Sequence, residues 1–189
     1  PLLQNDFMMT YESQQLSTYD IFDVPPSAPD TPSEIARSVG SPYDIYQAVT
    51  LDQSNGIFVF VPNHDDDPNT NDVYVVAGKL QSADSLDIIY SAAQQSYTSS
   101  PYPFPMITRM DNSMFALIYY DDTAIKTRFG SVDENLAIKL SNEVVVCNNT
   151  DYATNFYGTG LSASRYLVTC CEKCQSNVPN ADSATLQGN

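Results

Sequence analysis

Four cysteines in the last quarter of the chain are the residues best suited to covalent or metal bonds. They are Cys147, Cys170, Cys171 and Cys174. Adjacent cysteines rarely bond to each other because the ring that closes is strained. We therefore expect Cys147 to pair with Cys170 or Cys171, and Cys174 with the other one, which closes a loop worth about 3 kcal/mol. A zinc site of four thiolates is the alternative, but such sites usually draw on two separated Cys-x-x-Cys pairs, and only Cys171 and Cys174 have that spacing.

An acidic loop between two apolar runs is the second group that could do chemistry. Short carboxylates and amides alternate along it, as the first ligands of calcium-binding loops do. The loop lacks the central Gly and the closing Glu of an EF-hand and contains Pro68, so it is not an EF-hand, and the pattern favours a solvated hairpin tip without metal. A looser Ca²⁺ site is the alternative, and Ca²⁺ is the only cofactor that the sequence suggests. The candidate ligands are Asp65, Asp67, Asn69, Asn71 and Asp72.

Signals of catalysis are few. His64 is the only histidine, so any triad that needs an imidazole has one candidate base. Asp121 and Asp122 are adjacent and would point to opposite faces of a strand, which does not suit a pair of catalytic carboxylates. Without such a pair or a second histidine, we expect a protein that is not an enzyme.

Two short fragments are similar to motifs of the aspartic proteases. They are Asp122-Thr123-Ala124 and Tyr157-Gly158-Thr159-Gly160. The resemblance implies an aspartic-type hydrolase as the alternative function. Ala124 stands where the family motif has Gly, and no second Asp-Thr-Gly or Asp-Ser-Gly follows in the chain.

The charge balance excludes several classes of partner. The 189 residues include 8 Lys and Arg against 23 Asp and Glu, for a net charge of −15. Nucleic acids and anionic membrane surfaces are bound by basic side chains, so neither is an expected partner. A basic protein surface or a cation is the natural complement. Of the acidic residues 18 are Asp, which favours turns and loops over helices.

Several features point to an extracellular or cell-surface location. The cysteines suit an oxidising compartment, and Asn148-Asn149-Thr150 is a sequon for N-glycosylation at Asn148. No apolar run approaches the roughly 20 residues of a membrane span. The sequence therefore predicts a soluble, secreted glycoprotein without a membrane span.

The regular elements that would position these residues are mainly strands. The densest apolar runs are Ile57–Val61, Val73–Ala77 and Met114–Tyr120. One helix is predicted over Ala83–Gln95, because Ser82 can cap it and Leu86, Ile89, Tyr90 and Ala93 recur at helical spacing. No internal repeat is evident. Further predicted strands are Met106–Met110, Ala124–Phe129, Leu136–Leu140, Glu143–Cys147, Tyr152–Tyr157 and Arg165–Cys170, with Gly158-Thr159-Gly160 as a connector.

The two ends of the chain have a different character. Residues 1–30 combine apolar side chains of no clear period with a Pro-rich stretch, which predicts an extended arm and linker. A capping box predicts a short helix over Pro32–Ser38, and a second start signal predicts another that ends near Ala48. Residues 175–189 form a polar, unpatterned tail.

These elements predict an α+β fold that is mainly β. We expect one antiparallel β-sandwich or barrel-like domain over residues 31–174, with the central helix and two extended arms. An apolar arm must be buried somewhere, so we expect a structural subunit of an extracellular filament, coat or surface layer, held to copies of itself by exchange of terminal arms. A secreted, calcium-assisted lectin or adhesin that binds glycans is the alternative.

Overall fold

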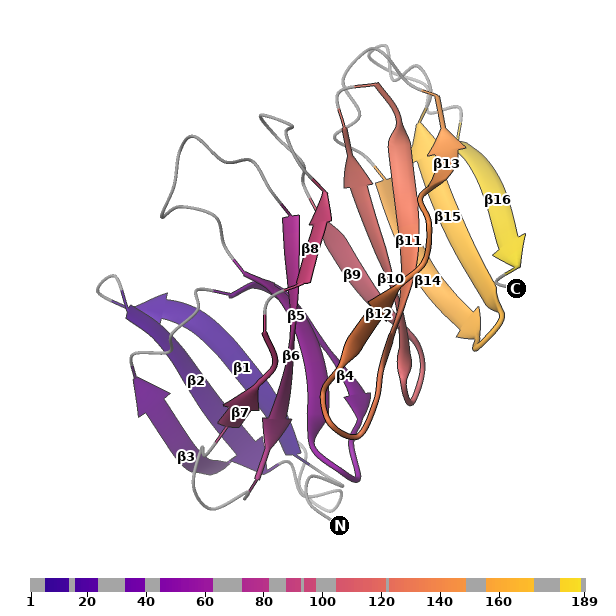
Figure 1. The fold of residues 1–189 in the computed structure, drawn as a ribbon. Helices are drawn as coiled ribbons and strands as arrows, with labels where there is room; N and C mark the ends of the chain where they lie inside the picture. Colours follow the sequence, from indigo (N-terminus) through magenta and orange to yellow (C-terminus); the bar gives the residue numbers. More distant parts are fainter. Residues whose placement is uncertain are drawn as a thin grey trace.

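The described part of the protein consists of strands in antiparallel sheets (Figure 1). The structure is a computed structural model. Within the described residues no helix occurs. The backbone is described over residues 6–13, 16–23, 33–39, 45–62, 73–81, 88–92, 94–97, 105–121, 123–148, 156–171 and 181–187.

The strands form four sheets that follow one another along the chain. In each sheet, paired strands run antiparallel, and consecutive strands are neighbours except that β8 pairs with β6 and β13 pairs with β11. The first sheet contains β1 (Asp6–Ser13), β2 (Leu16–Asp23) and β3 (Ser33–Val39). The second contains β4 (Ile45–Asp52), β5 (Ile57–Pro62), β6 (Val73–Leu80), β7 (Ile88–Tyr90) and β8 (Gln94–Tyr97). The third contains β9 (Met106–Asp111), β10 (Met114–Tyr120), β11 (Ile125–Val132), β12 (Ile138–Leu140) and β13 (Val144–Cys147). The fourth contains β14 (Phe156–Ser162), β15 (Arg165–Cys171) and β16 (Ala181–Gln187).

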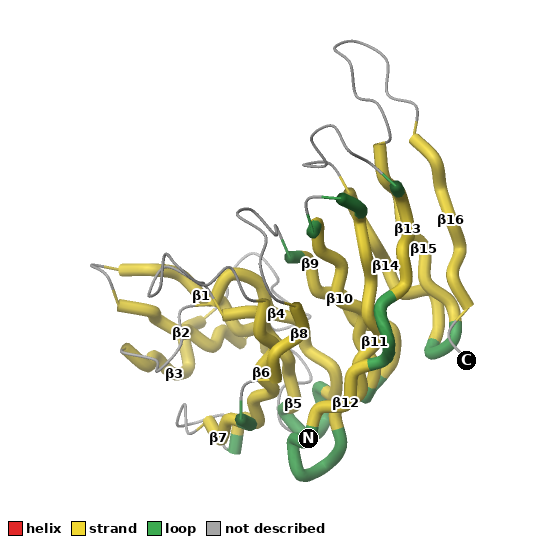
Figure 2. The backbone as a smooth tube through the Cα atoms, turned by 45° about the horizontal axis from the view of Figure 1, so that its top comes forward, coloured by secondary structure: helices red, strands yellow, loops and turns green. Residues whose placement is uncertain are grey.

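The sheets follow one another in chain order across the molecule, from β1–β3 at one end to β14–β16 at the other (Figures 1 and 2). The second sheet packs on the third, and the third on the fourth. The third sheet is buried on both faces. On β10, Phe115 and Leu117 belong to an apolar cluster shared with the second sheet, whereas Ala116 and Ile118 belong to a cluster shared with the fourth. Side chains alternate between the two faces of a strand. A strand covered on both faces is therefore apolar throughout, as β10 is.

The second and third sheets are copies of one structural unit. Within each unit, the register places a phenylalanine of the second strand opposite a glycine of the third: Phe58 opposite Gly78, and Phe115 opposite Gly130. A β-carbon on either glycine would overlap the ring of the facing phenylalanine. Because no other residue leaves room for the ring, the pair is a signature of the unit.

Two further features recur at matching places. The third strand of each unit pairs with two different strands, β6 with β7 and β8, and β11 with β12 and β13. The serine that follows the fourth strand accepts a hydrogen bond from the third strand in both units. Ser91 Oγ accepts from the backbone N–H of Ala77 at 2.9 Å, and Ser141 Oγ accepts from that of Phe129 at 3.0 Å. The absence of an internal repeat, inferred from the sequence, is therefore corrected by the structure.

The helix predicted over Ala83–Gln95 is not present in the described residues. Ile88–Tyr90 forms β7 and Gln94–Tyr97 forms β8, each paired with β6. The β-branched and aromatic side chains of Ile88, Ile89 and Tyr90 fit a pleated strand, and pairing with the end of β6 outweighs their helical spacing. The β-rich, antiparallel class is confirmed, whereas the central helix and the single sandwich or barrel are not confirmed by the described residues, whose strands form four sheets.

The ends of the chain also differ from expectation. Asp6–Ser13 and Leu16–Asp23, expected in an unpatterned arm, pair with each other as β1 and β2. The short helices predicted over Pro32–Ser38 and up to Ala48 are wrong, since Ser33–Val39 forms β3 and Ile45–Asp52 forms β4. Within the polar tail, Ala181–Gln187 pairs with β15 as β16. In each case the neighbouring strand supplies hydrogen-bond partners that the local sequence pattern does not reveal.

Candidate functional site

The residues predicted from the sequence fall into two groups. The candidate calcium ligands Asp65, Asp67, Asn69, Asn71 and Asp72 lie outside the described residues, as do His64, Asp122 and Cys174. Among the residues that the structure does describe, no group of three or more His, Cys, Asp or Glu side chains is placed to hold a metal ion. Both interpretations of the acidic loop, a hairpin tip without metal and a calcium site, therefore stay predictions.

A disulfide joins Cys147 at the end of β13 to Cys170 on β15, with Cα atoms 6.6 Å apart. This is one of the two pairings of Cys147 that the sequence left open. Both cysteines are buried in the cluster between the third and fourth sheets. The bond therefore links two successive sheets, and it suits an oxidising compartment. Asn148, the candidate glycosylation site, follows Cys147 directly and is exposed.

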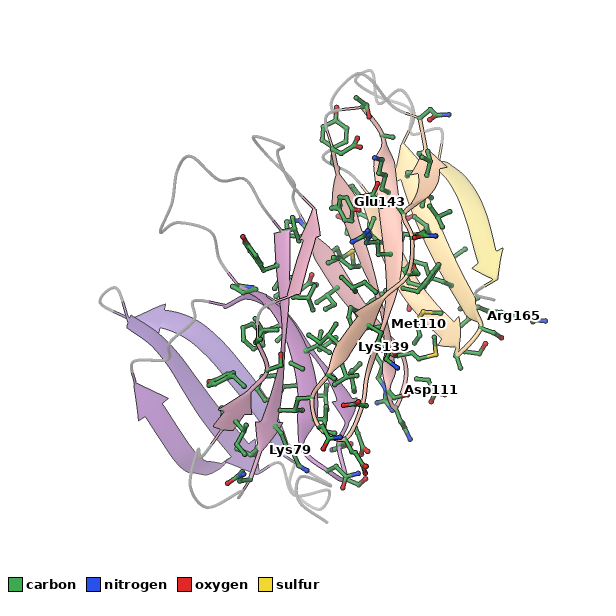
Figure 3. The ribbon with its side chains drawn as sticks, viewed as in Figure 1. Lys79, Met110, Asp111, Lys139, Glu143 and Arg165 are labelled. Carbon is green, nitrogen blue, oxygen red and sulfur yellow. A yellow bond between two sulfur atoms is a disulfide. The ribbon has the colours of Figure 1, made fainter. Side chains whose placement is uncertain are left out.

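A charged cluster occupies the turn between β10 and β11. The carboxylate of Asp121 accepts hydrogen bonds from Thr123 and Ala124 and forms an ion pair with Lys126. The Lys126 ammonium also lies 3.2 Å from a carboxylate oxygen of Glu143, and this carboxylate accepts a hydrogen bond of 2.7 Å from the Tyr119 hydroxyl. Figure 3 shows Glu143 just before β13. The cluster therefore connects the hairpin turn to the start of β13.

The pKa values of the two carboxylates in this cluster, Asp121 and Glu143, suit a role in holding the turn and β13 together. Burial alone would raise the pKa of Asp121, but hydrogen bonds from Lys126, Thr123 and Ala124 outweigh it and lower the pKa to about 2. For Glu143, burial is likewise outweighed by the contacts with Tyr119 and Lys126, and its pKa is lowered. Both carboxylates are therefore ionised at neutral pH, and neither has the raised pKa of a general acid.

The fragment resembling an aspartic protease motif, Tyr157-Gly158-Thr159-Gly160, lies within β14 and is not a connector. A β-carbon on Gly158 would collide with the Tyr166 hydroxyl and with Ile118, and one on Gly160 would collide with the backbone of β9. The two glycines therefore let β14 approach the third sheet closely. Packing between sheets accounts for both of them.

The opposite face of the same hairpin is open. We call it the outer face: it consists of the β14 and β15 side chains directed away from the third sheet. Tyr157 is 66% exposed and Leu161 is 56% exposed. Large apolar side chains grouped on an exposed sheet face mark interaction surfaces in soluble proteins. The outer face contains Tyr157, Thr159, Leu161, Leu167 and Thr169.

Sequence reasoning missed the outer face, which becomes evident only when the strand pairing of successive sheets is compared. In the three hairpins that open the second, third and fourth sheets, one bulged residue precedes the turn: Leu51, Met110 and Leu161. Leu51 and Met110 are buried against the next sheet in the stack, and Met110 is labelled in Figure 3. When the three hairpins are aligned, Leu161 occupies the position of Leu51 and Met110, but its side chain is exposed instead of buried by a following sheet.

Comparison with known proteins gives no family assignment: no family model and no curated protein matches this chain.

Proposed function

We propose that the protein is a structural subunit of an extracellular assembly, a filament, coat or surface layer, in which copies of the chain bind one another. The observation that carries the proposal is the outer face of the fourth sheet. Tyr157 and Leu161 lie open there, whereas the matching face of each of the two preceding sheets is buried by the next sheet. Burial of a large apolar side chain contributes roughly 1.5–3 kcal/mol, so covering this face favours association.

Two further properties support this function. The disulfide between Cys147 and Cys170 stabilises the end of the stack that carries the outer face, as suits a protein outside the cell. The described charged cluster is arranged for connection and not for acid-base chemistry. In the described part of the chain, no helix has both the length and the apolar character that a membrane crossing requires.

The mode of association that we propose differs from the arm exchange expected from the sequence. β1, β2 and β3 pair with one another, and β16 pairs with β15 of its own chain. The terminal segments therefore already have hydrogen-bond partners within the molecule. Contact between sheet faces replaces exchange of arms as the proposed means of assembly.

Sedimentation velocity over a wide range of protein concentration tests the proposal, with parallel samples in calcium and in EDTA. We expect larger species to increase with concentration to the same extent in both buffers, because the outer face contains no metal ligand. A monomer at every concentration would contradict the proposal. Assembly that requires calcium would instead support a metal-dependent role for the acidic loop at 65–72.

A further inference from the structure

We propose that the outer face of one copy binds the β1–β3 sheet of a second copy, so that copies join head to tail and extend the stack of sheets. This inference rests on the proposed function and names its partner surface. The two participating sheets lie at opposite ends of the molecule (Figure 1). Each copy therefore offers one surface of each kind.

The two described junctions within the chain show what such a contact requires. At the first junction, Val59 and Val61 of β5 share an apolar cluster with Phe115, Leu117 and Tyr119 of β10. At the second, the corresponding face of β10 shares a cluster with β15 through Ala116, Ile118, Tyr166 and Val168. We call the face of a sheet that points toward the next sheet in chain order its forward face, and the opposite face its backward face. At both junctions, forward-facing residues on the second strand of one sheet contact backward-facing residues on the second strand of the next sheet.

The outer face consists of the forward-facing residues of the fourth sheet. The residue pair that closes each hairpin fixes the alignment: Asp52 with Ile57, Asp111 with Met114, and Ser162 with Arg165. Counting from these pairs, Leu161 matches Leu51 and Met110, Leu167 matches Val59 and Ala116, Thr169 matches Val61 and Ile118, and Tyr157 matches Gln47 and Met106. The forward face that holds the following sheet at two junctions within the chain is therefore present a third time on the fourth sheet, where Tyr157 and Leu161 are exposed.

The first sheet opens with a hairpin whose turn has the same length as that of the third sheet, although β1 and β2 pair without the bulge that precedes the turn in the other three sheets. Ser13 and Leu16 close the β1–β2 hairpin with two residues between them, as Asp111 and Met114 close the β9–β10 hairpin. Leu16 therefore aligns with Met114. This alignment places Tyr19 at the position of Leu117, and Ile21 at the position of Tyr119.

The symmetry of the contact follows from the same pattern. Each described junction joins a forward face to a backward face, and neither joins two forward faces. An association of this kind is heterologous, so it continues into a filament or closes into a ring. Contact between two outer faces would instead stop at a dimer.

The test uses Leu161→Asp and Tyr157→Asp, each of which places a carboxylate on the outer face. Ile89→Asp is the matched control, since Ile89 is 46% exposed on β7, away from this face. A buried unpaired charge is costly, so each outer-face variant should raise the dissociation constant for assembly by about tenfold or more. The control should assemble as the native chain does. Circular dichroism and urea midpoints equal to those of the native protein show that the variants are folded.

Mixing distinguishes the head-to-tail contact from its alternatives. A Leu161→Asp copy still has an intact β1–β3 sheet, so small amounts added to native protein should cap growing assemblies and shorten them. The complementary variant Tyr19→Asp, mixed in equal amount with Leu161→Asp, should give dimers and nothing larger.

Other outcomes overturn the inference in different ways. If native protein assembles and Leu161→Asp and Tyr157→Asp assemble equally well, the inference is wrong while the proposed function stands. Loss of assembly without capping would show that two outer faces meet each other, which also overturns the head-to-tail contact. A native chain that stays monomeric would contradict both the inference and the proposed function.

Discussion

The pairing of Phe115 with Gly130 makes a quantitative prediction about the repeated unit. A β-carbon at position 130 would overlap the outer atoms of the Phe115 ring. Phe115 has no exposed surface, so the ring has no open space into which it can move. Overpacking of this kind costs about 1–3 kcal/mol. Replacing Gly by Ala also lowers the conformational entropy of the unfolded chain, which offsets about 0.4–1 kcal/mol of this cost. Gly130→Ala should therefore destabilise the protein by about 1–2 kcal/mol.

A double-mutant cycle isolates the contact. Phe115→Leu removes the ring atoms with which the new β-carbon would collide, so Gly130→Ala should cost little in that background. The coupling free energy should be about 1–2 kcal/mol, measured from urea unfolding by circular dichroism because the chain has no Trp. The equivalent pair, Gly78→Ala with Phe58→Leu, should give coupling of the same sign. Effects that add to within about 0.5 kcal/mol in both cycles would refute the account of the repeat.

Three further predictions concern the connections within and between sheets. Replacing Cys147 and Cys170 together by Ser should lower the unfolding free energy by about 3 kcal/mol, since the bond closes a loop with a sequence separation of 23; an unchanged urea midpoint would contradict this. The pKa of Asp121 is depressed to about 2, so its contribution is complete above pH 4 and lost as pH falls toward 2. This contribution is about 2 kcal/mol at most, and Asp121→Asn should flatten the urea midpoint between those pH values; an unaltered pH profile would argue against the role of the cluster. Ser141→Ala should cost about 1 kcal/mol, as should Ser91→Ala; a cost at only one of them would count against equivalent units.

The apolar strands were predictable because they are buried on both faces. Ile57–Pro62, Val73–Leu80 and Met114–Tyr120 form β5, β6 and β10, close to the bounds that the sequence indicates. A central strand in a stack has no solvent face, so its apolar run is unbroken and easy to detect. The helix prediction failed where this signal is weakest, at the short outer strand β7, whose pairing with β6 depends on tertiary structure.

The repeat was not predictable by direct inspection because its connections differ in length. Residues 63–72 separate β5 from β6, whereas only 121–124 separate β10 from β11. The conserved feature is the order of a phenylalanine, its facing glycine and a serine after the fourth strand: Phe58, Gly78 and Ser91 in one unit, and Phe115, Gly130 and Ser141 in the next. A search for this order at variable spacing would have found it.

The candidate site depends on three-dimensional arrangement more than on residue type. Tyr157 and Leu161 are unremarkable in the sequence, and nothing in their spacing indicates exposure. Their significance comes from the matching positions of the second and third sheets, where the equivalents are covered. The cysteines were recognisable from the sequence because a disulfide depends on residue identity, but the choice of Cys170 over Cys171 depends on which side of β15 faces β13.

Electron cryomicroscopy of the assembled native protein tests the central claim most directly. The account predicts that β14–β16 of one copy lies face to face with β1–β3 of the next, so that the stack of sheets continues across the boundary between copies. An assembly in which the outer face, with Tyr157 and Leu161, is open to solvent would contradict it.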